Sequence, residues 1–196
     1  MIKAIVFDCF GVLIADVLRT RAMSIQATNP EGAETIFGTL KQLDLGLISR
    51  EQGMQQIATG INVPLEEVLA MTSGGEVRNS ELIDMIPTFR RTYKIGLLSN
   101  VRGRKWLEER FLPGELDEKF DNVVASGDVG IVKPQPEIYH LMAQQLGVLP
   151  EECVMIDDLQ SGFDGAIAAG MKAVHYHNNQ QALADLQTIL DNNAHV

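Results

Sequence analysis

The chain has 196 residues, of which 45% are hydrophobic and 21% are charged, and its formal net charge is -10. This composition is ordinary for a globular protein, and the negative charge disfavours non-specific binding to nucleic acid or to anionic membranes. A small molecule is therefore the expected ligand. No apolar run approaches the roughly 18 residues of a membrane span, and residues 1–3 lead directly into a strand without a signal-peptide pattern, so we expect a cytoplasmic protein. The oligomeric state is left open.

The first predicted element is a short apolar strand that ends at Phe7 and leads into Asp8, with a glycine turn at Gly11. A carboxylate at the carboxyl end of a buried strand lies where an open parallel α/β sheet binds its ligands. The next residue, Cys9, and the distant Cys153 are predicted to be reduced, buried thiols. Asp8 is therefore the first candidate site residue.

Residues 15–75 are predicted to form a small all-helical insertion after this strand. Apolar residues recur three and four positions apart, and Ser49 and Gln52 have the spacing of a capping box that opens a helix. We expect a hinge at residues 73–75, where two glycines follow a serine. Three methionines in these helices are expected to fill the core, namely Met23, Met54 and Met71.

From residue 80 onward, predicted helices and strands alternate. The strands are apolar on both faces, which is typical of a parallel sheet covered by helices on both sides. Such connections form right-handed βαβ units. The sequence therefore predicts an α/β fold, a Rossmann-like parallel sheet whose core comprises residues 1–14 and 76–196. The predicted strands are 95–98, 122–125, 153–156 and 173–175, and the predicted helices are 80–91, 106–111, 136–146, 160–169 and 181–190.

Three later segments place polar side chains at the end of a strand or the start of a helix, as Asp8 does. They are Ser99-Asn100, Lys133-Pro134 and Asp157-Asp158. Each has an ordinary structural explanation, such as a helix cap or a surface lysine. Together with Asp8 and in this order, they indicate a single site built at one edge of the sheet.

These segments resemble the four motifs of the haloacid dehalogenase (HAD) superfamily of aspartate-nucleophile hydrolases. In that family the first motif reads Asp-x-Asp, the second is Ser or Thr, the third is Lys and the fourth is an acidic pair. The chain departs from the pattern at Phe10, where the family has its second aspartate. The insertion after the first strand is similar to that of the phosphatase-like branch with a helical cap. The matching residues are Asp8, Ser99, Lys133, Asp157 and Asp158.

The resemblance implies a HAD-like core in which the first strand lies between the second and the fourth, so that Asp8 and Asp157 emerge side by side. Crowded carboxylates repel one another, and a hard divalent cation with oxygen ligands, Mg²⁺, relieves that repulsion. The implied metal ligands are Asp8, Asp157, the main-chain carbonyl of Phe10 and, directly or through water, Asp158.

The family chemistry implies that Asp8 attacks phosphorus and forms an aspartyl-phosphate that water then hydrolyses. The developing charge must be neutralised by fixed donors and cations. The implied catalytic residues are Asp8, Ser99 and Lys133, and the implied phosphate-binding residues are Cys9, Phe10, Ser99, Asn100 and Lys133.

Phe10 bears directly on activity, because the aspartate that it replaces protonates the leaving group in the phosphatases of this family. Help of that kind is worth about 10² to 10⁴ in rate. Three readings follow: the enzyme is slow, its leaving group needs no proton, or another group such as Asp16 supplies the proton.

The sequence predicts a Mg²⁺-dependent phosphatase acting on a small phosphate ester, with residues 15–75 as a cap that carries specificity. Two alternatives stay open. One is a metal-independent haloacid dehalogenase, since dehalogenases of this family also lack the second aspartate. The other is a catalytically impaired binding or regulatory protein. The late histidines His175 and His177 are expected to be structural.

Overall fold

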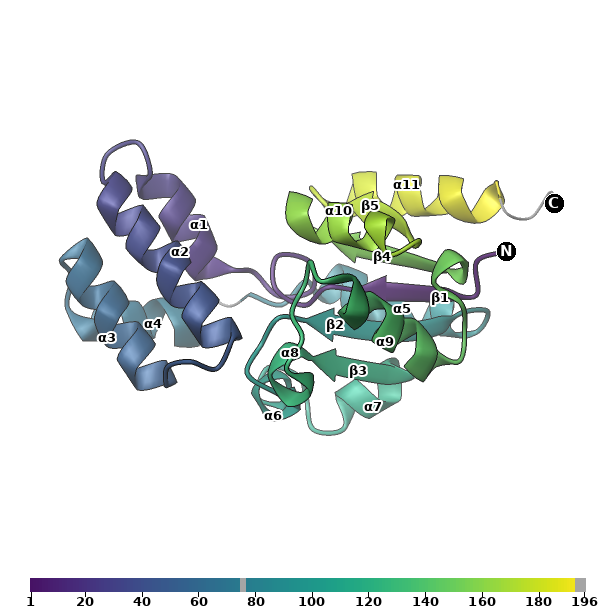
Figure 1. The fold of residues 1–196 in the computed structure, drawn as a ribbon, viewed down its shortest axis with the longest axis horizontal. Helices are drawn as coiled ribbons and strands as arrows, with labels where there is room; N and C mark the ends of the chain where they lie inside the picture. Colours follow the sequence, from purple (N-terminus) through teal and green to yellow (C-terminus); the bar gives the residue numbers. More distant parts are fainter. Residues whose placement is uncertain (75–76, 193–196) are drawn as a thin grey trace. The chain divides into compact units, whose positions relative to one another are not determined.

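A computed structural model of the protein describes residues 1–74 and 77–192. The chain forms two compact units: one comprises Met1–Leu13 and Asn79–Val196, and the other comprises Ile14–Arg78. The first is an α/β unit, and the regular elements described in the second are helices, apart from an isolated bridge between Ile14 and Arg78. Figure 1 shows the elements of each unit along the chain.

The α/β unit contains a five-stranded parallel sheet in the order β3-β2-β1-β4-β5 (Figure 1). The first strand thus lies between the second and the fourth, and the predicted fold class is confirmed. The central strands are buried along almost their whole length, which explains their continuous apolar sequence. The strands are β1 (Ala4–Phe7), β2 (Lys94–Ser99), β3 (Asn122–Ala125), β4 (Cys153–Asp157) and β5 (Lys172–His175).

Helices cover both faces of this sheet. On one face α9 and α10 pack against the strands, and α5 and α11 lie on the other (Figure 1). The short elements α7, α8 and the 3₁₀ turn η1 are absent from the sequence prediction, and α6 begins and ends slightly earlier than predicted. The helices are α5 (Ser80–Arg90), α6 (Arg104–Glu108), α7 (Glu115–Lys119), α8 (Ser126–Val129), α9 (Pro136–Leu146), η1 (Pro150–Glu152), α10 (Gln160–Ala168) and α11 (Asn179–Asp191).

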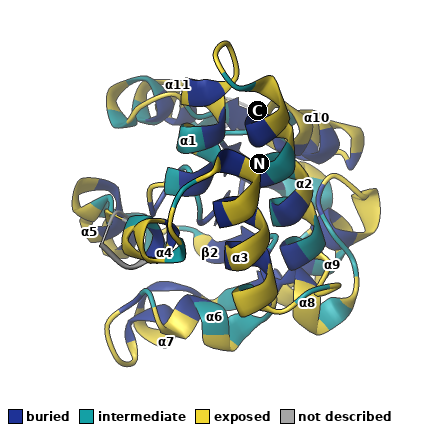
Figure 2. Cartoon of the chain, turned by 90° about the vertical axis from the view of Figure 1, so that its left-hand side faces the viewer, coloured by how far each residue is buried: buried dark blue, intermediate teal, exposed yellow. Residues whose placement is uncertain are grey.

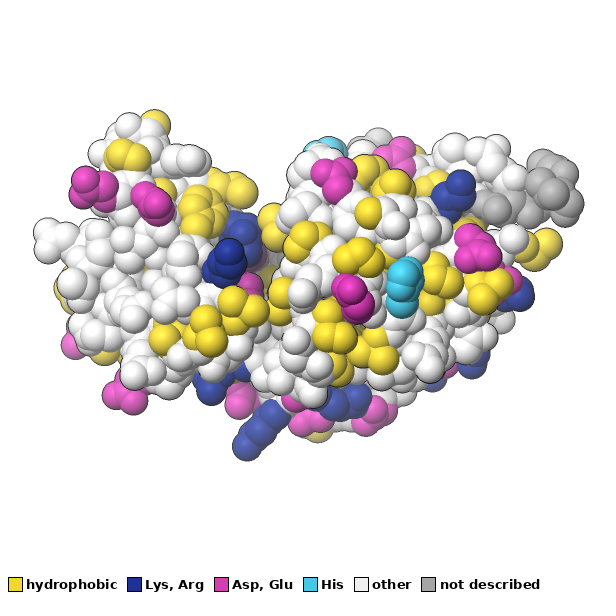
Figure 3. Space-filling model, in the orientation of Figure 1, with side chains coloured by type: hydrophobic (Ala, Val, Ile, Leu, Met, Phe, Trp, Pro, Cys, Tyr) yellow, Lys and Arg dark blue, Asp and Glu magenta, His cyan; other side chains and the backbone are white. Residues whose placement is uncertain are grey.

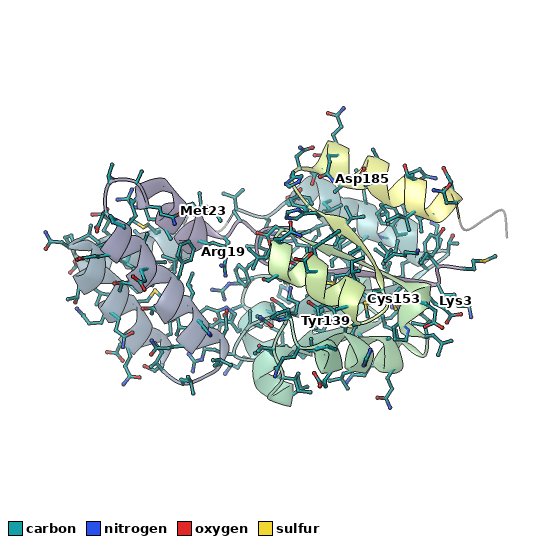
Figure 4. All side chains as sticks on the ribbon, turned by 45° about the horizontal axis from the view of Figure 1, so that its top comes forward. Lys3, Arg19, Met23, Tyr139, Cys153 and Asp185 are labelled. Atoms are coloured by element: carbon teal, nitrogen blue, oxygen red, sulfur yellow. The ribbon has the colours of Figure 1, made fainter. Side chains whose placement is uncertain are left out.

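One hydrophobic cluster joins α9 and α10 to the sheet. Tyr139, from α9, is among the largest fully buried side chains, and Figure 4 shows it among the side chains of this unit. Its hydroxyl donates a hydrogen bond to the carbonyl of Gly162 at 2.9 Å, so the buried polar atom has a partner. This contact fixes the first turn of α10 against α9.

The described residues of the helical unit form four helices with a core of their own. Their inward faces are buried and their outward faces exposed, as the colours of α2 and α3 show in Figure 2. Ser49 and Gln52 form the predicted capping box: the Ser49 hydroxyl accepts from the Gln52 N–H, and the Gln52 side chain accepts from the Ser49 N–H. The helices are α1 (Val17–Ile25), α2 (Pro30–Asp44), α3 (Arg50–Ile61) and α4 (Leu65–Gly74).

The three methionines of the helical unit differ in burial. Met54 is 3% exposed and packs in the core as predicted, and Met71 is half-buried. Met23, labelled in Figure 4, is 58% exposed, so its assignment to the core was wrong. Of the predicted hinge at 73–75, the first two residues belong to α4 and Gly75 lies outside the described residues.

Within residues 1–74 and 77–192, no helix has the length and apolar character needed to cross a membrane. Acidic side chains are dispersed over the visible face of each unit in Figure 3, in keeping with the net charge of -10.

The contrast between Met54 and Met23 gives a matched pair of substitutions. Met54→Ala should lower the free energy of unfolding by about 2–5 kcal/mol, because it opens a cavity in the helical core. Met23→Ala should change it by less than about 0.5 kcal/mol, because the side chain is mostly in water. Urea unfolding of both variants measures the difference, and equal effects would contradict the packing described here.

Candidate active site

The register of the central strands brings Asp8 and Asp157 to the same level. The last paired residues of β1 and β4 are Phe7 and Ile156, and each is followed by an aspartate. The N–H of Asp8 donates to the carbonyl of Ile156 at 2.9 Å, which continues the ladder by one step. The two carboxylates therefore emerge at one edge of the sheet, where the chain path reverses on either side of β1.

Lys133 lies between these carboxylates. Its Nζ is 2.6 Å from Oδ2 of Asp157 and 2.9 Å from Oδ2 of Asp8. The three side chains are at most 7% exposed, so the ion pairs are shielded from solvent. A lysine from the segment after β3 thus joins aspartates from two neighbouring strands.

Asn100 holds the main chain of Lys133 in place. Its side-chain Oδ1 accepts from the Lys133 N–H at 2.8 Å, and its Nδ2 donates to the Lys133 carbonyl at 3.0 Å. This two-bond contact uses both ends of the amide. Asn100 follows directly on β2, so the end of that strand fixes the position of the lysine.

Burial and charge act in opposite directions on these groups. Burial raises the pKa of Asp8 well above its usual range; Lys133 opposes that rise, and the carboxylates of Asp157 and Asp158 add to it. Burial alone would lower the pKa of Lys133, but the carboxylates of Asp157 and Asp8 outweigh it and raise that pKa overall. Lys133 is therefore fully charged in the physiological range.

Asp158 completes an acidic cluster with Asp8 and Asp157. One carboxylate oxygen from each lies within 4.8 Å of the other two. With all three ionised and Lys133 protonated, three negative charges meet one positive charge, which leaves a net charge of -2. Oxygen-only donors with this excess charge fit a hard divalent cation such as Mg²⁺.

Two glycines leave room for these carboxylates. A Cβ at Gly11, whose φ is +88°, would lie 2.2 Å from the carboxyl group of Asp158. A Cβ at Gly162 in α10 would lie 2.3 Å from the carboxyl group of Asp157. Because such contacts are far closer than van der Waals distance, side chains at these positions would displace the acidic cluster.

The other predicted site residues lie along the same edge. Ser99 is the last residue of β2 and is 1% exposed. The N–H of Cys9 donates to Oδ1 of Asp8 at 2.7 Å, so this amide orients the carboxylate. Phe10 is half-buried, and the guanidinium of Arg110 lies over its ring with Cζ 5.4 Å from the ring centroid.

A polar network around Asn79, which the sequence did not predict, holds the segment that follows Asp8. Asn79 donates through Nδ2 to the carbonyl of Val12 at 2.9 Å and to Tyr176 and Asn179. Its N–H also donates to the carbonyl of Leu13 at 2.8 Å. The carbonyl of Val12 is thus tied to Asn79, 67 positions along the chain, and through Asn79 to Tyr176 and Asn179, and no local pattern could have indicated that.

The histidines lie beside the fourth motif. His175 Nε2 is 3.0 Å from the main-chain carbonyl of Asp158, and its ring is 4.5 Å from that of His177, centroid to centroid. His175 thus contacts the main chain of the fourth motif.

Comparison with known proteins agrees with this geometry. A family model described as haloacid dehalogenase-like hydrolase matches residues 2–170. The chain belongs to this family.

D-ribitol-5-phosphate phosphatase from Bacteroides thetaiotaomicron is 29% identical, and the match covers 97% of this chain and 100% of that protein. The phosphorylated carbohydrates phosphatase of Thermotoga maritima is 35% identical, over 47% of this chain and 44% of its own length. For six of the curated relatives that the chain matches, the match covers only 8% to 44% of the relative's own length.

Solved structures share the fold. A HAD family enzyme from Bacteroides thetaiotaomicron, crystallised with magnesium and inorganic phosphate, superposes with a TM-score of 0.70 and 23% identity, over 93% of this hydrolase and 99% of that chain. At this identity the likeness establishes the fold of the chain.

The glycine contacts predict opposite effects of the same substitution in two helices. Gly162→Ala should lower the free energy of unfolding by about 1–3 kcal/mol, because the new methyl group displaces the carboxylate of Asp157. Gly38→Ala, in the interior of α2 with no atom within 4 Å of the new Cβ, should raise it by about 0.5–1 kcal/mol. Denaturant unfolding in a chelator measures both, and an unchanged stability of Gly162→Ala would show that the site is not packed in this way.

Proposed function

We propose that this hydrolase is a Mg²⁺-dependent phosphatase that acts on a small phosphorylated molecule through an aspartyl-phosphate on Asp8. The observation that carries the proposal is the placement of the Lys133 ammonium within 2.9 Å of Asp8 and 2.6 Å of Asp157. A buried acid beside a fixed cation, with further carboxylates next to it, is the arrangement that phosphoryl transfer requires.

The metal would be held by the carboxylates of Asp8 and Asp157, by the main-chain carbonyl of Phe10 and, directly or through water, by Asp158. The excess of two negative charges in the cluster supports this assignment. A bound cation would favour the ionised form of Asp8 and neutralise charge on the phosphoryl oxygens.

The phosphoryl group would be bound by Lys133, the Ser99 hydroxyl and the main-chain N–H of Phe10. The amides of Cys9 and Asn100 act indirectly in this proposal. The Cys9 N–H orients Oδ1 of Asp8, and the Asn100 side chain positions the main chain of Lys133. Both residues therefore fix the geometry of groups that contact the substrate.

In the first chemical step, a carboxylate oxygen of Asp8 forms a bond to phosphorus while the bond from phosphorus to the leaving oxygen breaks. The leaving group departs with the electron pair of that bond. In the second step, water attacks the phosphorus of the aspartyl-phosphate, its proton passes to a phosphate oxygen, and the Asp8 carboxylate is regenerated. Lys133 offsets the charge on the phosphoryl oxygens in both steps.

The family membership and the phosphatase names of relatives support a phosphorylated small molecule as substrate. We propose that residues 15–75 act as a cap that excludes water and carries specificity. The support for this cap is the insertion of a helical unit with its own core directly after the segment that follows β1.

Asp16 is a poor substitute for the missing acid. Its Oδ1 accepts from the Arg19 N–H at 2.9 Å as the N-cap of α1, and its Oδ2 pairs with the Arg19 Nε at 3.0 Å. Both carboxylate oxygens of Asp16 are thus engaged by Arg19 at the start of α1, whereas a general acid must be placed to donate a proton to the leaving group.

A phosphatase assay on sugar phosphates and nucleotides tests the proposal. The wild-type protein should release inorganic phosphate with Mg²⁺ and lose that activity in a chelator. Asp8→Asn should lower the rate at least about 10³-fold, because the nucleophile is removed. The matched control is Asp185→Asn, an exposed aspartate on α11 labelled in Figure 4, which should keep the wild-type rate.

Other outcomes identify the alternatives. Halide release from a haloacid in the presence of chelator would favour the metal-independent dehalogenase. A rise in melting temperature with Mg²⁺ and phosphate, with no turnover on any substrate, would favour a binding protein. Full phosphatase activity of Asp8→Asn would overturn the assignment of the nucleophile.

A further inference from the structure

The residue that replaces the family acid is part of an aromatic and cationic cluster. The guanidinium carbon of Arg110 lies 3.9 Å from the ring centroid of Trp106 and 5.4 Å from that of Phe10. The Arg110 side chain is only 8% exposed. Its Nη1 donates to the Trp106 carbonyl at 2.9 Å, which fixes the orientation of the guanidinium plane.

The elements that carry this cluster meet at the active-site edge of the sheet. Phe10 follows Asp8 by two residues, and Trp106 lies in α6, which follows Ser99 at the end of β2. Figure 1 shows α6 beyond the arrowheads of β2 and β3, at the carboxyl end of the sheet. A buried cation is thus held in contact with the loop that directly follows the proposed nucleophile.

The chemistry of a guanidinium differs from that of a carboxylic acid. Arginine keeps its proton at all physiological pH values, so Arg110 cannot act as the general acid that Phe10 lacks. It can stabilise a negative charge on oxygen by its own charge and by N–H donors, more strongly where water is excluded. Stacking on two aromatic rings holds it in place. The Glu109 carboxylate lies 3.9 Å from Arg110 Nη1, and because that side chain is 59% exposed it offsets the charge of Arg110 only weakly.

We propose that Arg110 binds the leaving-group oxygen and that the substrates are phosphate compounds with an acidic leaving group, such as aryl phosphates, acyl phosphates or phosphoanhydrides. This inference rests on the proposed phosphatase function. As the bond from Asp8 to phosphorus forms, the bond from phosphorus to the leaving oxygen breaks. The leaving group keeps the electron pair and departs as an anion beside Arg110, with no proton transferred in that step.

A series of aryl phosphates with leaving phenols of different acidity tests the proposal through kcat/KM. The wild-type enzyme should hydrolyse 4-nitrophenyl phosphate much faster than phenyl phosphate, whose leaving phenol has a pKa of about 10. Arg110→Met should lower kcat/KM for phenyl phosphate by about 10²-fold and for 4-nitrophenyl phosphate by less, because a more basic leaving oxygen needs more stabilisation.

Three further variants sharpen the test. Phe10→Asp should raise kcat/KM more for phenyl phosphate than for 4-nitrophenyl phosphate, because it restores a proton donor for the more basic leaving oxygen. Arg110→Lys keeps the positive charge, so its ratio of kcat/KM for the two aryl phosphates should stay closer to the wild-type ratio than that of Arg110→Met. The matched control is Arg104→Met, because Arg104 lies in α6, the helix that carries Trp106, but pairs with Glu108 at 3.1 Å on the surface. It should leave both rates and their ratio unchanged.

The ratio of the two rates is measured within one preparation, so partial unfolding of a variant does not affect it. Equal losses of Arg110→Met on both substrates, or a wild-type rate independent of leaving-group acidity, would overturn the role of Arg110 and the substrate class. A wild-type protein that hydrolyses none of these compounds and no sugar phosphate or nucleotide would instead contradict the phosphatase function itself.

Discussion

The contact on which the site depends is the pairing of one lysine with two aspartates from adjacent strands. The Lys133 ammonium lies 2.9 Å from Asp8 and 2.6 Å from Asp157, and all three side chains are buried. Removing one partner from such a buried pair typically costs about 3–5 kcal/mol, because an uncompensated charge is left behind. Parallel pairing of β1 and β4 sets the separation of the two aspartates. The Asn100 side-chain amide fixes the position of the Lys133 main chain. The sheet thus fixes the acidic groups and the loops fix the cation.

A chemical consequence follows from the balance of charge around Asp8. With its three carboxylates ionised and Lys133 protonated, the cluster carries two more negative charges than positive ones, which favours a divalent cation such as Mg²⁺. At position 10 the chain offers an aromatic ring and a guanidinium in place of a carboxylic acid. Stabilisation of a departing anion then takes over the task that proton donation performs elsewhere in the family. We propose that this exchange narrows the range of leaving groups while the nucleophile and its lysine are kept.

Much of this arrangement could be predicted from the sequence. The strand around Phe7, the Ser49 capping box and the alternation after residue 80 are local patterns, and each agrees with the structure. The strand order and the meeting of Asp8 with Asp157 came from the family resemblance, since spacing alone does not give them. Arg110, Tyr139 and Gly162 were missed, because their roles depend on contacts across the fold and no local pattern marks them. Met23 was assigned to the core because helical periodicity does not tell which face of a short helix is covered.

In the proposed site, carboxylates from two neighbouring strands bind one divalent cation beside the nucleophile. Anomalous diffraction from crystals of the protein soaked with Mn²⁺, used in place of Mg²⁺, tests it most directly. One strong anomalous peak is expected at the end of the sheet, bound by the carboxylates of both Asp8 and Asp157. A peak bound elsewhere, or none at a concentration of Mn²⁺ that supports turnover, would contradict it.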